Sequence, residues 1–214
     1  SSGVCDRIER EGMRHDGIYL RFNDELHRIN MGALTGGRAI TIYGQNEVVK
    51  DLIDARQASG RPLYFEASDV SVGDLEAETP RVRFVQGDET LELVCDFVAG
   101  CDGSHGVCRP SIPASRVRVY ERGYPFAWLG ILADAPPASD EIVYSLSERG
   151  FALFSMRSTT ITRLYLQCSP DENLDEWSDD RIWAELMARL RTTDGWAPHV
   201  LSLIHISEPT RQAE

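Results

Sequence analysis

Residues 150–168 read GFALFSMRSTTITRLYLQC, and this stretch predicts a pair of antiparallel β-strands. The strands are residues 151–156 and 162–168, in which apolar and polar side chains alternate, and the polar segment 158–161 forms the turn between them. A hairpin of this kind needs further strands beside it to be stable in water. The surrounding sequence should therefore contain a larger sheet.

The alternation of the hairpin decides which of its side chains lie together. Successive side chains point to opposite faces of a strand, so Ser155, Arg157 and Tyr165 can share one face with the apolar Phe151 and Leu153. A guanidinium flanked by two hydroxyls beside an apolar wall suits an aromatic carboxylate, which an arginine binds with two parallel hydrogen bonds. An exposed arginine paired with a surface acid is the alternative, and the pattern alone favours it.

Tyr144 lies on the preceding predicted strand, residues 141–146. A tyrosine in the core would need no further explanation. Its hydroxyl could instead bind a substrate phenol and help to remove the phenolic proton, because both groups titrate near pH ~10.

The remaining sequence completes a mixed fold. Further strands are predicted at 117–120 and 126–133, followed by a helix at 179–190 that Ser178 caps. The N-terminal half predicts the end of a helix at 6–12, a hairpin at 17–21 and 25–29, a strand at 39–43, a helix at 45–58, short strands at 63–67, 69–72, 81–85 and 91–94, and a buried strand at 97–99. The fold class is therefore α/β (α+β), with one domain at residues 1–116 and a β-sheet domain with a C-terminal helix at 117–200.

Composition excludes several classes of partner. The chain has 214 residues, 42% of them hydrophobic, and a net charge of −12, which argues against nucleic acid and anionic membranes as partners. No apolar run approaches the ~18 residues of a membrane span, and no secretory signal opens the chain. The five cysteines form no CxxC pair, so we expect reduced thiols, no metal site and a cytoplasmic protein.

Residues 201–211, LSLIHISEPTR, resemble the conceptual translation of a sequencing-library adapter. We therefore expect residues 201–214 to be foreign to the protein and to contribute nothing to its fold. A natural short strand followed by a turn is the alternative.

A second cluster of polar residues is the loop GCDGSHGVCR at residues 100–109. Asp102 and Gly103 at a strand end would let the backbone approach a ligand closely and would supply an acceptor for ribose hydroxyls. His105 and Arg109 could hold phosphate charge. Taken alone, an Asp-Gly pair is an ordinary turn.

The loop resembles the Asp-Gly fingerprint of the flavoprotein aromatic hydroxylases, the family of the 4-hydroxybenzoate 3-monooxygenase type. Further similar segments occur in the same order and spacing, so the resemblance runs almost continuously from Asp6 to Leu190. These segments are IYGQ at 42–45, residues 97–109, YPFAWLG at 124–130, RGFAL at 149–153 and EWSD at 176–179.

The resemblance implies a role for each candidate residue. Arg157, Ser155 and Tyr165 match the residues that bind the substrate carboxylate, and Tyr144 matches the tyrosine on the phenolic oxygen. His15 matches the histidine at the outer end of a proton relay from that tyrosine; a solvated loop histidine is the alternative. The cofactor-binding positions that match are Gln45 and Arg163 for the flavin, Asp102 and Gly103 in the fingerprint, and His105 and Arg109 for the nicotinamide nucleotide.

The resemblance also implies the reaction and its cofactors. Residues 1–116 would be a partial Rossmann-like FAD-binding domain and residues 117–200 the substrate-binding domain. FAD, reduced by NADPH (or NADH), would use dioxygen to convert 4-hydroxybenzoate, a small aromatic acid, into 3,4-dihydroxybenzoate, and the complete protein would be a homodimer. Another phenolic acid could be the substrate. A non-catalytic, β-rich carboxylate-binding module is the alternative from a different class.

Some features of the family are not found in this sequence. The G-x-G-x-x-G turn that holds the FAD pyrophosphate is missing, as are the later Gly-Asp segment and the second relay tyrosine. Ser104 and Cys108 also differ from the commonest residues of the fingerprint loop. We therefore expect the chain to be an internal fragment that alone binds FAD poorly and is inactive.

Overall fold

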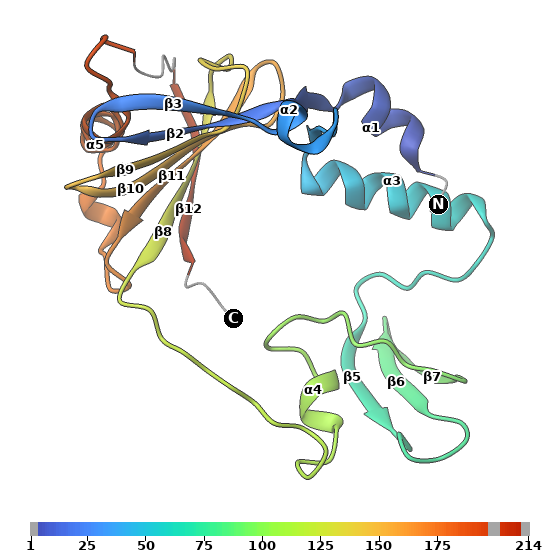
Figure 1. Cartoon of the computed structure of the whole chain (residues 1–214). Coiled ribbons are helices and arrows are strands. Elements are labelled where there is room, and N and C mark those ends of the chain that lie inside the picture. The colour runs from blue at the N-terminus through green and yellow to red at the C-terminus, as the bar shows by residue number, and fades with distance from the viewer. Residues whose placement is uncertain (1–3, 197–201, 211–214) are drawn as a thin grey trace. The chain divides into compact units, whose positions relative to one another are not determined.

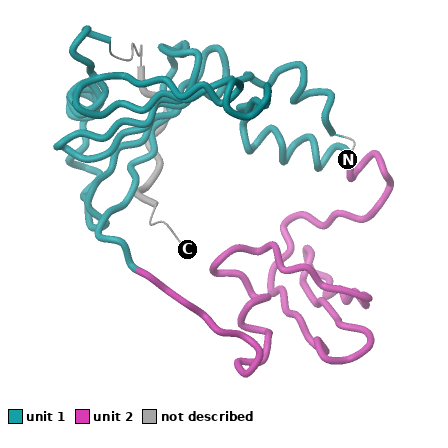
Figure 2. Tube along the Cα trace, in the orientation of Figure 1, with its two compact units in different colours: residues 1–55, 123–212 teal, residues 56–122, 213–214 magenta. Residues whose placement is uncertain are grey.

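The computed structural model describes residues 4–196 and the backbone of residues 202–210. The chain forms two compact units, which Figure 2 distinguishes by colour. Unit 1 contains residues 1–55 and 123–212, and unit 2 contains residues 56–122 with 213–214. These units divide the N-terminal half at residue 55, whereas the expected domain boundary lies near residue 116. The fold is mixed, as the sequence predicts.

A seven-stranded sheet forms the centre of unit 1 (Figure 1). All its neighbours are antiparallel except the parallel pair β2 and β9. Its strands, in spatial order, are β12 (Ser202–Thr210), β8 (Ala127–Asp134), β11 (Ile161–Cys168), β10 (Gly150–Met156), β9 (Val143–Ser147), β2 (Gly17–Phe22) and β3 (Glu25–Asn30).

One face of this sheet packs against helix α5 (Asp179–Leu190), which contacts β9 and β10. The amphipathic pattern of the helix places Ile182, Leu186 and Leu190 toward the sheet, where each is fully buried. Ser178 caps the helix by accepting a hydrogen bond from the Arg181 N–H at 3.3 Å. A short 3-10 helix, η1 (Leu174–Glu176), precedes it. The core of the chain therefore lies between this face and α5.

The hairpin of β2 and β3 extends the sheet, although it lies far from the other strands in sequence. Its turn residues Asn23 and Asp24 have φ angles of 51° and 61°. These left-handed conformations are the ones that a two-residue hairpin turn requires, and asparagine and aspartate adopt them readily. The predicted hairpin is confirmed, and it joins the sheet of the C-terminal half.

Three helices and a two-stranded ribbon complete the N-terminal part of unit 1. Helix α1 (Cys5–Glu11) is linked to α3 (Gln45–Ala58) by Arg7, which forms ion pairs with Glu47 and with Asp51. The ribbon pairs β1 (Met13–His15) with β4 (Ile40–Ile42), and the short helix α2 (Met31–Thr35) follows β3.

Unit 2 contains a three-stranded antiparallel sheet of β5 (Ser68–Gly73), β6 (Arg81–Gln86) and β7 (Glu89–Val94), and the four-residue helix α4 (Cys108–Ser111). The predicted strands at 63–67, 97–99 and 117–120 are wrong, because these residues form no strand. Phe97, expected to be buried, is 90% exposed. Apolar runs predicted these strands, but a strand also needs a partner for its backbone hydrogen bonds, and these segments pair with no described strand.

The segment expected to be foreign lies at the edge of the sheet as β12, beside β8. Its register shifts twice, between Leu203 and His205 and between Ser207 and Thr210. Whether this strand stabilises the fold stays a prediction, which a truncation can test.

None of the described helices is both long and apolar enough to cross a membrane.

Candidate functional site

The face of the seven-stranded sheet opposite α5 carries the predicted substrate residues, and we call it the site face. Backbone register places Tyr144, Leu153 and Tyr165 in one row across β9, β10 and β11. Ser155 lies opposite Arg163 in the next row. The alternation deduced from the sequence is therefore present in the structure, because the side chains between these positions, such as Phe154 and Leu164, lie in the core.

Aromatic side chains form an apolar wall on the site face. Phe151 packs edge-on against Trp128, with ring centroids 5.1 Å apart. The Tyr144 ring lies 6.3 Å from the Phe151 ring, also between centroids. Such contacts hold rings in fixed positions, and they leave the Tyr144 side chain partly exposed.

Arg157 follows β10, and its guanidinium interacts with the Tyr165 hydroxyl. Partial burial lowers the pKa of Arg157, and the positive charge of Arg163 lowers it further, whereas Tyr165 opposes both effects. The guanidinium of Arg163 lies over the Tyr165 ring, 4.7 Å from its centroid. Among the described residues, no carboxylate forms an ion pair with either arginine. Two like charges therefore lie close together without an anion to neutralise them.

Both arginines line an open groove of about 1050 Å³ that lies wholly within unit 1. Gln45, a predicted flavin contact, lines the same groove, as does Leu132 of β8. The groove is large enough for an extended organic ligand, for which sites commonly measure about 300–1,000 Å³. The structure thus brings Gln45, Arg157 and Arg163 together, as the resemblance implies for a site that holds flavin beside substrate.

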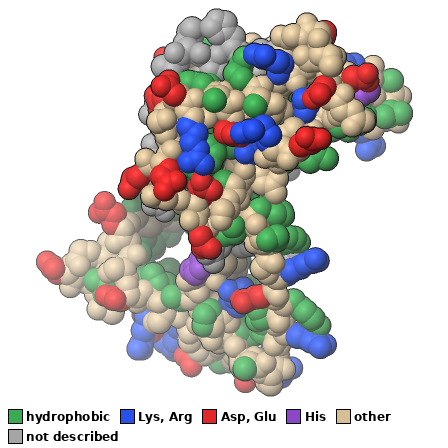
Figure 3. Space-filling view, turned by 90° about the vertical axis from the view of Figure 1, so that its left-hand side faces the viewer, with side chains coloured by type: hydrophobic (Ala, Val, Ile, Leu, Met, Phe, Trp, Pro, Cys, Tyr) green, Lys and Arg blue, Asp and Glu red, His purple; other side chains and the backbone are tan. Residues whose placement is uncertain are grey.

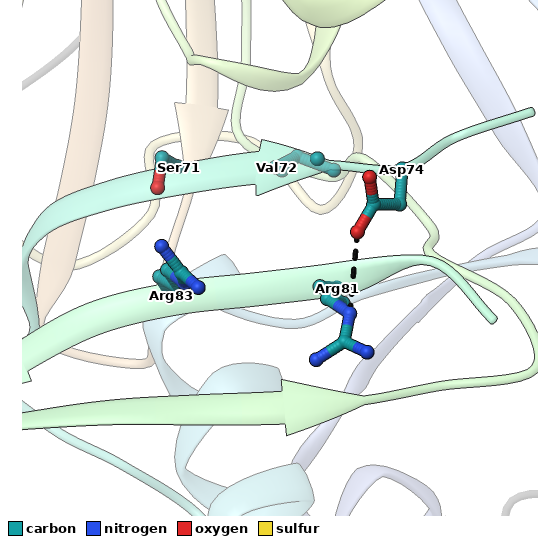
Figure 4. Close-up of a pocket in the computed structure, with 6 residues that line it drawn as sticks. Ser71, Val72, Asp74, Arg81 and Arg83 are labelled. Atoms are coloured by element: carbon teal, nitrogen blue, oxygen red, sulfur yellow. Dashed lines mark ion pairs between the residues drawn. The ribbon is translucent and has the colours of Figure 1, made fainter. Parts of the chain in front are cut away.

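Unit 2 has a smaller hollow of about 320 Å³, in which the arginines form ion pairs with acidic side chains (Figure 4). Arg81 pairs there with Asp74 at 3.2 Å and with Glu92, and Arg83 also pairs with Glu92. Acidic and basic side chains are interspersed in the same way over the face drawn in Figure 3. Arg157 and Arg163 are exceptions to this pairing among the described residues.

His15 does not meet Tyr144 in this structure. It is 1% exposed, and its Nε2 lies 2.7 Å from the sulfur of Met156. Met156 alternates with Ser155 along β10, so its side chain points to the face opposite the site face. The alternative interpretation, in which His15 is a solvated loop residue, is therefore wrong. The role of His15 in a proton relay stays a prediction.

The fingerprint loop of unit 2 forms a small hydrogen-bonded structure. Asp102 accepts a hydrogen bond from the Cys108 N–H at 2.9 Å, and this bond is the main cause of the lowered pKa of its carboxyl. His105 contacts the Ser104 hydroxyl at 3.0 Å, and Arg109 donates to the Ser104 carbonyl. The loop thus brings the predicted nucleotide-binding residues together, beside the positive φ of 74° at Gly103.

Sequence reasoning missed two features near the site. Trp128 supplies part of the apolar wall, and its alternation with the buried Leu129 along β8 could have revealed it. Glu141 forms a two-pronged pair with Arg28, 113 residues away in sequence. No local pattern could have revealed that pair, because it depends on β2 lying beside β9.

Known proteins were found that are similar to this chain in sequence. The chain is 45% identical over 189 residues to a protein of Acinetobacter baylyi named p-hydroxybenzoate hydroxylase, a match that covers 88% of this chain and 46% of that protein. The chain therefore spans about half the length of the curated relative that it matches.

Solved structures share the fold at low sequence identity. A p-nitrophenol 4-monooxygenase from Pseudomonas putida aligns with a TM-score of 0.72 and 14% identity, over 99% of this chain and 56% of that one. An aklavinone-11 hydroxylase, solved with FAD and aklavinone, aligns with a TM-score of 0.70 and 17% identity, over 99% of this chain and 43% of that one.

A family model described as the FAD binding domain matches residues 1–213, nearly the whole sequence. The chain belongs to the FAD-binding domain family.

Proposed function

We propose that this chain is part of an FAD-dependent monooxygenase that hydroxylates 4-hydroxybenzoate to 3,4-dihydroxybenzoate with NADPH (or NADH) and dioxygen. The observation that carries the proposal is the pair of uncompensated arginines beside the aromatic wall of the site face. The relative named p-hydroxybenzoate hydroxylase, 45% identical, supports the choice of substrate.

The carboxylate end of the substrate belongs at Arg157 in this proposal. Arg157 would form the charge pair, while Ser155 and Tyr165 supply hydroxyl hydrogen bonds to the remaining lone pairs. Ser155 is almost fully buried, and its hydroxyl has only a 3.4 Å contact with the Met156 carbonyl. Its hydrogen-bonding capacity is therefore largely unused and available for a ligand.

The phenol end belongs at Tyr144. Tyr144 of β9 lies opposite Leu153 of β10, and Arg157 is four residues after Leu153 in the chain. At about 3.3 Å per residue the two positions are roughly 13 Å apart along the sheet, so two side chains can reach a single ring from opposite ends. A ring with its charged and phenolic groups para to each other fits that arrangement.

The residues that would hold FAD in unit 1 are Gln45 and Arg163, which line the groove beside Arg157. Two adjacent guanidinium groups without acidic partners suit a cofactor whose reduced ring carries negative charge next to an anionic substrate. When bound, FAD supplies the reducing equivalents and the activated oxygen. The work of this chain is to bind the acid, orient its ring and take up the phenolic proton through Tyr144.

The test uses a protein of family length that contains this chain, supplied with FAD, NADPH and dioxygen. We expect 3,4-dihydroxybenzoate from 4-hydroxybenzoate, measured by chromatography, and little turnover of 4-nitrophenol, which lacks the carboxylate. Faster hydroxylation of 4-nitrophenol would contradict the substrate assignment. Tight binding of 4-hydroxybenzoate without oxygen consumption would support a carboxylate-binding module instead.

A further inference from the structure

One end of the hairpin of β10 and β11 is held together by side chains. The backbone ladder between these strands extends as far as the pair of Ala152 with Leu166. One residue beyond that pair, the Phe151 N–H donates to Oε1 of Gln167 at 2.9 Å. The carbonyls of Phe151 and Gln167 both accept a hydrogen bond from Nη1 of Arg189, at 3.2 Å and 2.8 Å. A residue of helix α5 therefore joins the two strands where their ladder ends.

Arg189 is also bound to a third strand. Its own carbonyl accepts a hydrogen bond from the hydroxyl of Ser145, a fully buried residue of β9. Ser145 directly follows Tyr144, and successive side chains of a strand point to opposite faces, so this bond lies on the face of β9 opposite Tyr144. Because Ser145 lies opposite Ala152, Arg189 contacts β9, β10 and β11 at the same end.

The guanidinium of Arg189 is buried together with an acid. Its side chain is 8% exposed, and its Nε and Nη2 each lie 3.0 Å from Oε2 of Glu185, one turn earlier in α5. An apolar side chain would fill the same space without removing a charge from water. Only the planar fork of an arginine, however, has enough donors to bind the carboxylate and both strand carbonyls at once. The pair with Glu185 thus orients the guanidinium toward the two carbonyls.

Phe151, whose backbone Arg189 holds, is the ring that links the aromatic wall to Tyr144. Its ring centroid lies 5.1 Å from that of Trp128 and 6.3 Å from that of Tyr144. Arg157 lies beyond the other end of β10, six residues after Phe151. At about 3.3 Å per residue this is roughly 20 Å away. A shift of the Phe151 backbone would therefore move the phenol end of the proposed site and leave the carboxylate end in place.

We propose that Arg189 is a positioning residue, which fixes Phe151 and with it the ring of Tyr144 through its hydrogen bonds to the carbonyls of Phe151 and Gln167. The inference rests on the proposed function, in which Tyr144 takes up the phenolic proton. Arg189 acts from α5, across the sheet from the site face, so it does not touch the substrate. Its loss should disturb the orientation of the phenol at Tyr144 and leave the binding of the carboxylate to Arg157 nearly unchanged.

The first test measures amide hydrogen exchange in the 214-residue chain by NMR and needs neither substrate nor cofactor. The Phe151 amide reports on the held end of the hairpin, and the Arg157 amide, which donates to the Ile161 carbonyl at 2.8 Å, reports on the other end. Arg189→Met should speed exchange of Phe151 relative to Arg157 by about tenfold, the size expected when hydrogen bonds from a charged group are lost. Equal acceleration of both amides, or none, would overturn the proposal.

Arg149→Met is the matched control. Arg149 also pairs with Glu185, but its side chain is 58% exposed, and in the described structure it binds neither strand carbonyl. It should leave the ratio of the two exchange rates unchanged, and a change as large as that of Arg189→Met would count against the proposal.

Arg189→Lys is the second variant, in case Arg189→Met does not fold. It keeps the charge opposite Glu185, but a single ammonium cannot replace the planar fork at both carbonyls. Phe151 should again exchange faster relative to Arg157, by less than in Arg189→Met. An unaltered ratio in Arg189→Lys would mean that the two carbonyl bonds do not hold this end of the hairpin.

The second test uses a protein of family length with 4-hydroxybenzoate, NADPH and dioxygen. In both Arg189 variants the product formed per NADPH oxidised should fall, while the dissociation constant of 4-hydroxybenzoate stays within a few-fold; Arg149→Met should change neither. Unaltered coupling, or a loss of affinity as large as the loss of coupling, would overturn the proposal. If the unaltered protein forms no 3,4-dihydroxybenzoate, the proposed function fails, whereas the exchange test still decides whether Arg189 holds Phe151.

Discussion

Arg157 and Arg163 place two positive charges in the groove of unit 1, in a chain whose net charge is −12. Most arginines of the described chain are paired: Arg7 binds three carboxylates, and Arg149 and Arg189 share Glu185. Leaving two guanidinium groups together without an acid costs free energy through repulsion and desolvation. Such a cost is typical of a binding site, where the ligand removes it.

Tyr144→Phe should separate substrate binding from hydroxylation. The ring would keep its packing beside Phe151, with only the hydroxyl lost. In a protein of family length we expect 4-hydroxybenzoate to bind within a few-fold of its original affinity, while product formed per NADPH oxidised falls and hydrogen peroxide rises. Leu146→Ala, on the same strand, is the control and should leave this ratio unchanged. Normal coupling in Tyr144→Phe would remove Tyr144 from the site.

His15 should make stability depend on pH. Burial lowers the pKa of His15 in the folded chain below the ordinary value of 6.5. Between the folded pKa and 6.5, the unfolded chain therefore binds protons more readily than the folded chain. The free energy of unfolding should therefore fall as pH decreases from 6.5 to the folded pKa, and stay level below it as far as His15 is concerned. His15→Gln should lose this part of the dependence in urea titrations. His105→Gln, at an exposed loop position, should retain it.

At the scale of elements, the sheet and α5 stabilise the site without touching a ligand. Leu186→Ala removes a fully buried side chain between α5 and the sheet and should cost about 2–5 kcal/mol of unfolding free energy. Leu146→Ala removes the same atoms from a position that is 61% exposed and should change it by no more than about 0.5 kcal/mol. Chemical denaturation measures both, and equal costs would mean that α5 is not the main anchor.

The sequence pattern says least about how much the edge strand β12 contributes to the stability of the fold. Truncation after Val200 removes residues 201–214, the adapter-like stretch and the residues that follow it. We expect the melting midpoint to stay unchanged, because β8 keeps its eight-pair ladder with β11 and its core contacts. The two register shifts of β12 also indicate imperfect pairing. A clear drop in the midpoint would show that the segment is part of the fold.

Sequence periodicity predicted the elements whose pattern is local. It predicted α5 and the four strands from β8 to β11, because burial on one side imposes their period. It also predicted α3 from apolar spacing, although no residue of that helix is buried, and the Asn23-Asp24 turn residues predicted the first hairpin. It failed at residues 97–99, where an apolar run is exposed. Likewise, alternation placed Ser155, Arg157 and Tyr165 on one face, but the absence of an acid near Arg157 and the pair of Glu141 with Arg28 depend on segments distant in sequence.

On the scale of the whole molecule, the chain spans 46% of the relative to which it is 45% identical. Unit 1 contains the site face and the groove, and unit 2 contains the fingerprint loop with Asp102. Substrate, nicotinamide nucleotide and oxygen chemistry are therefore properties proposed for a protein of family length. The central claim to be tested on a protein of family length is that Arg157 binds the substrate carboxylate.

The most direct test compares 4-hydroxybenzoate with 4-hydroxybenzamide, which keeps the ring and phenol but carries no charge. Dissociation constants are measured for both ligands with the unaltered protein, with Arg157→Ala, and with Arg149→Ala as the control. Removing one partner of a partly buried charge pair costs about 2–5 kcal/mol, so Arg157→Ala should weaken 4-hydroxybenzoate by about ten- to a thousandfold. The same change should weaken the amide only a few-fold. Equal losses for the two ligands would contradict the account, because Arg157 would then not be recognising the carboxylate.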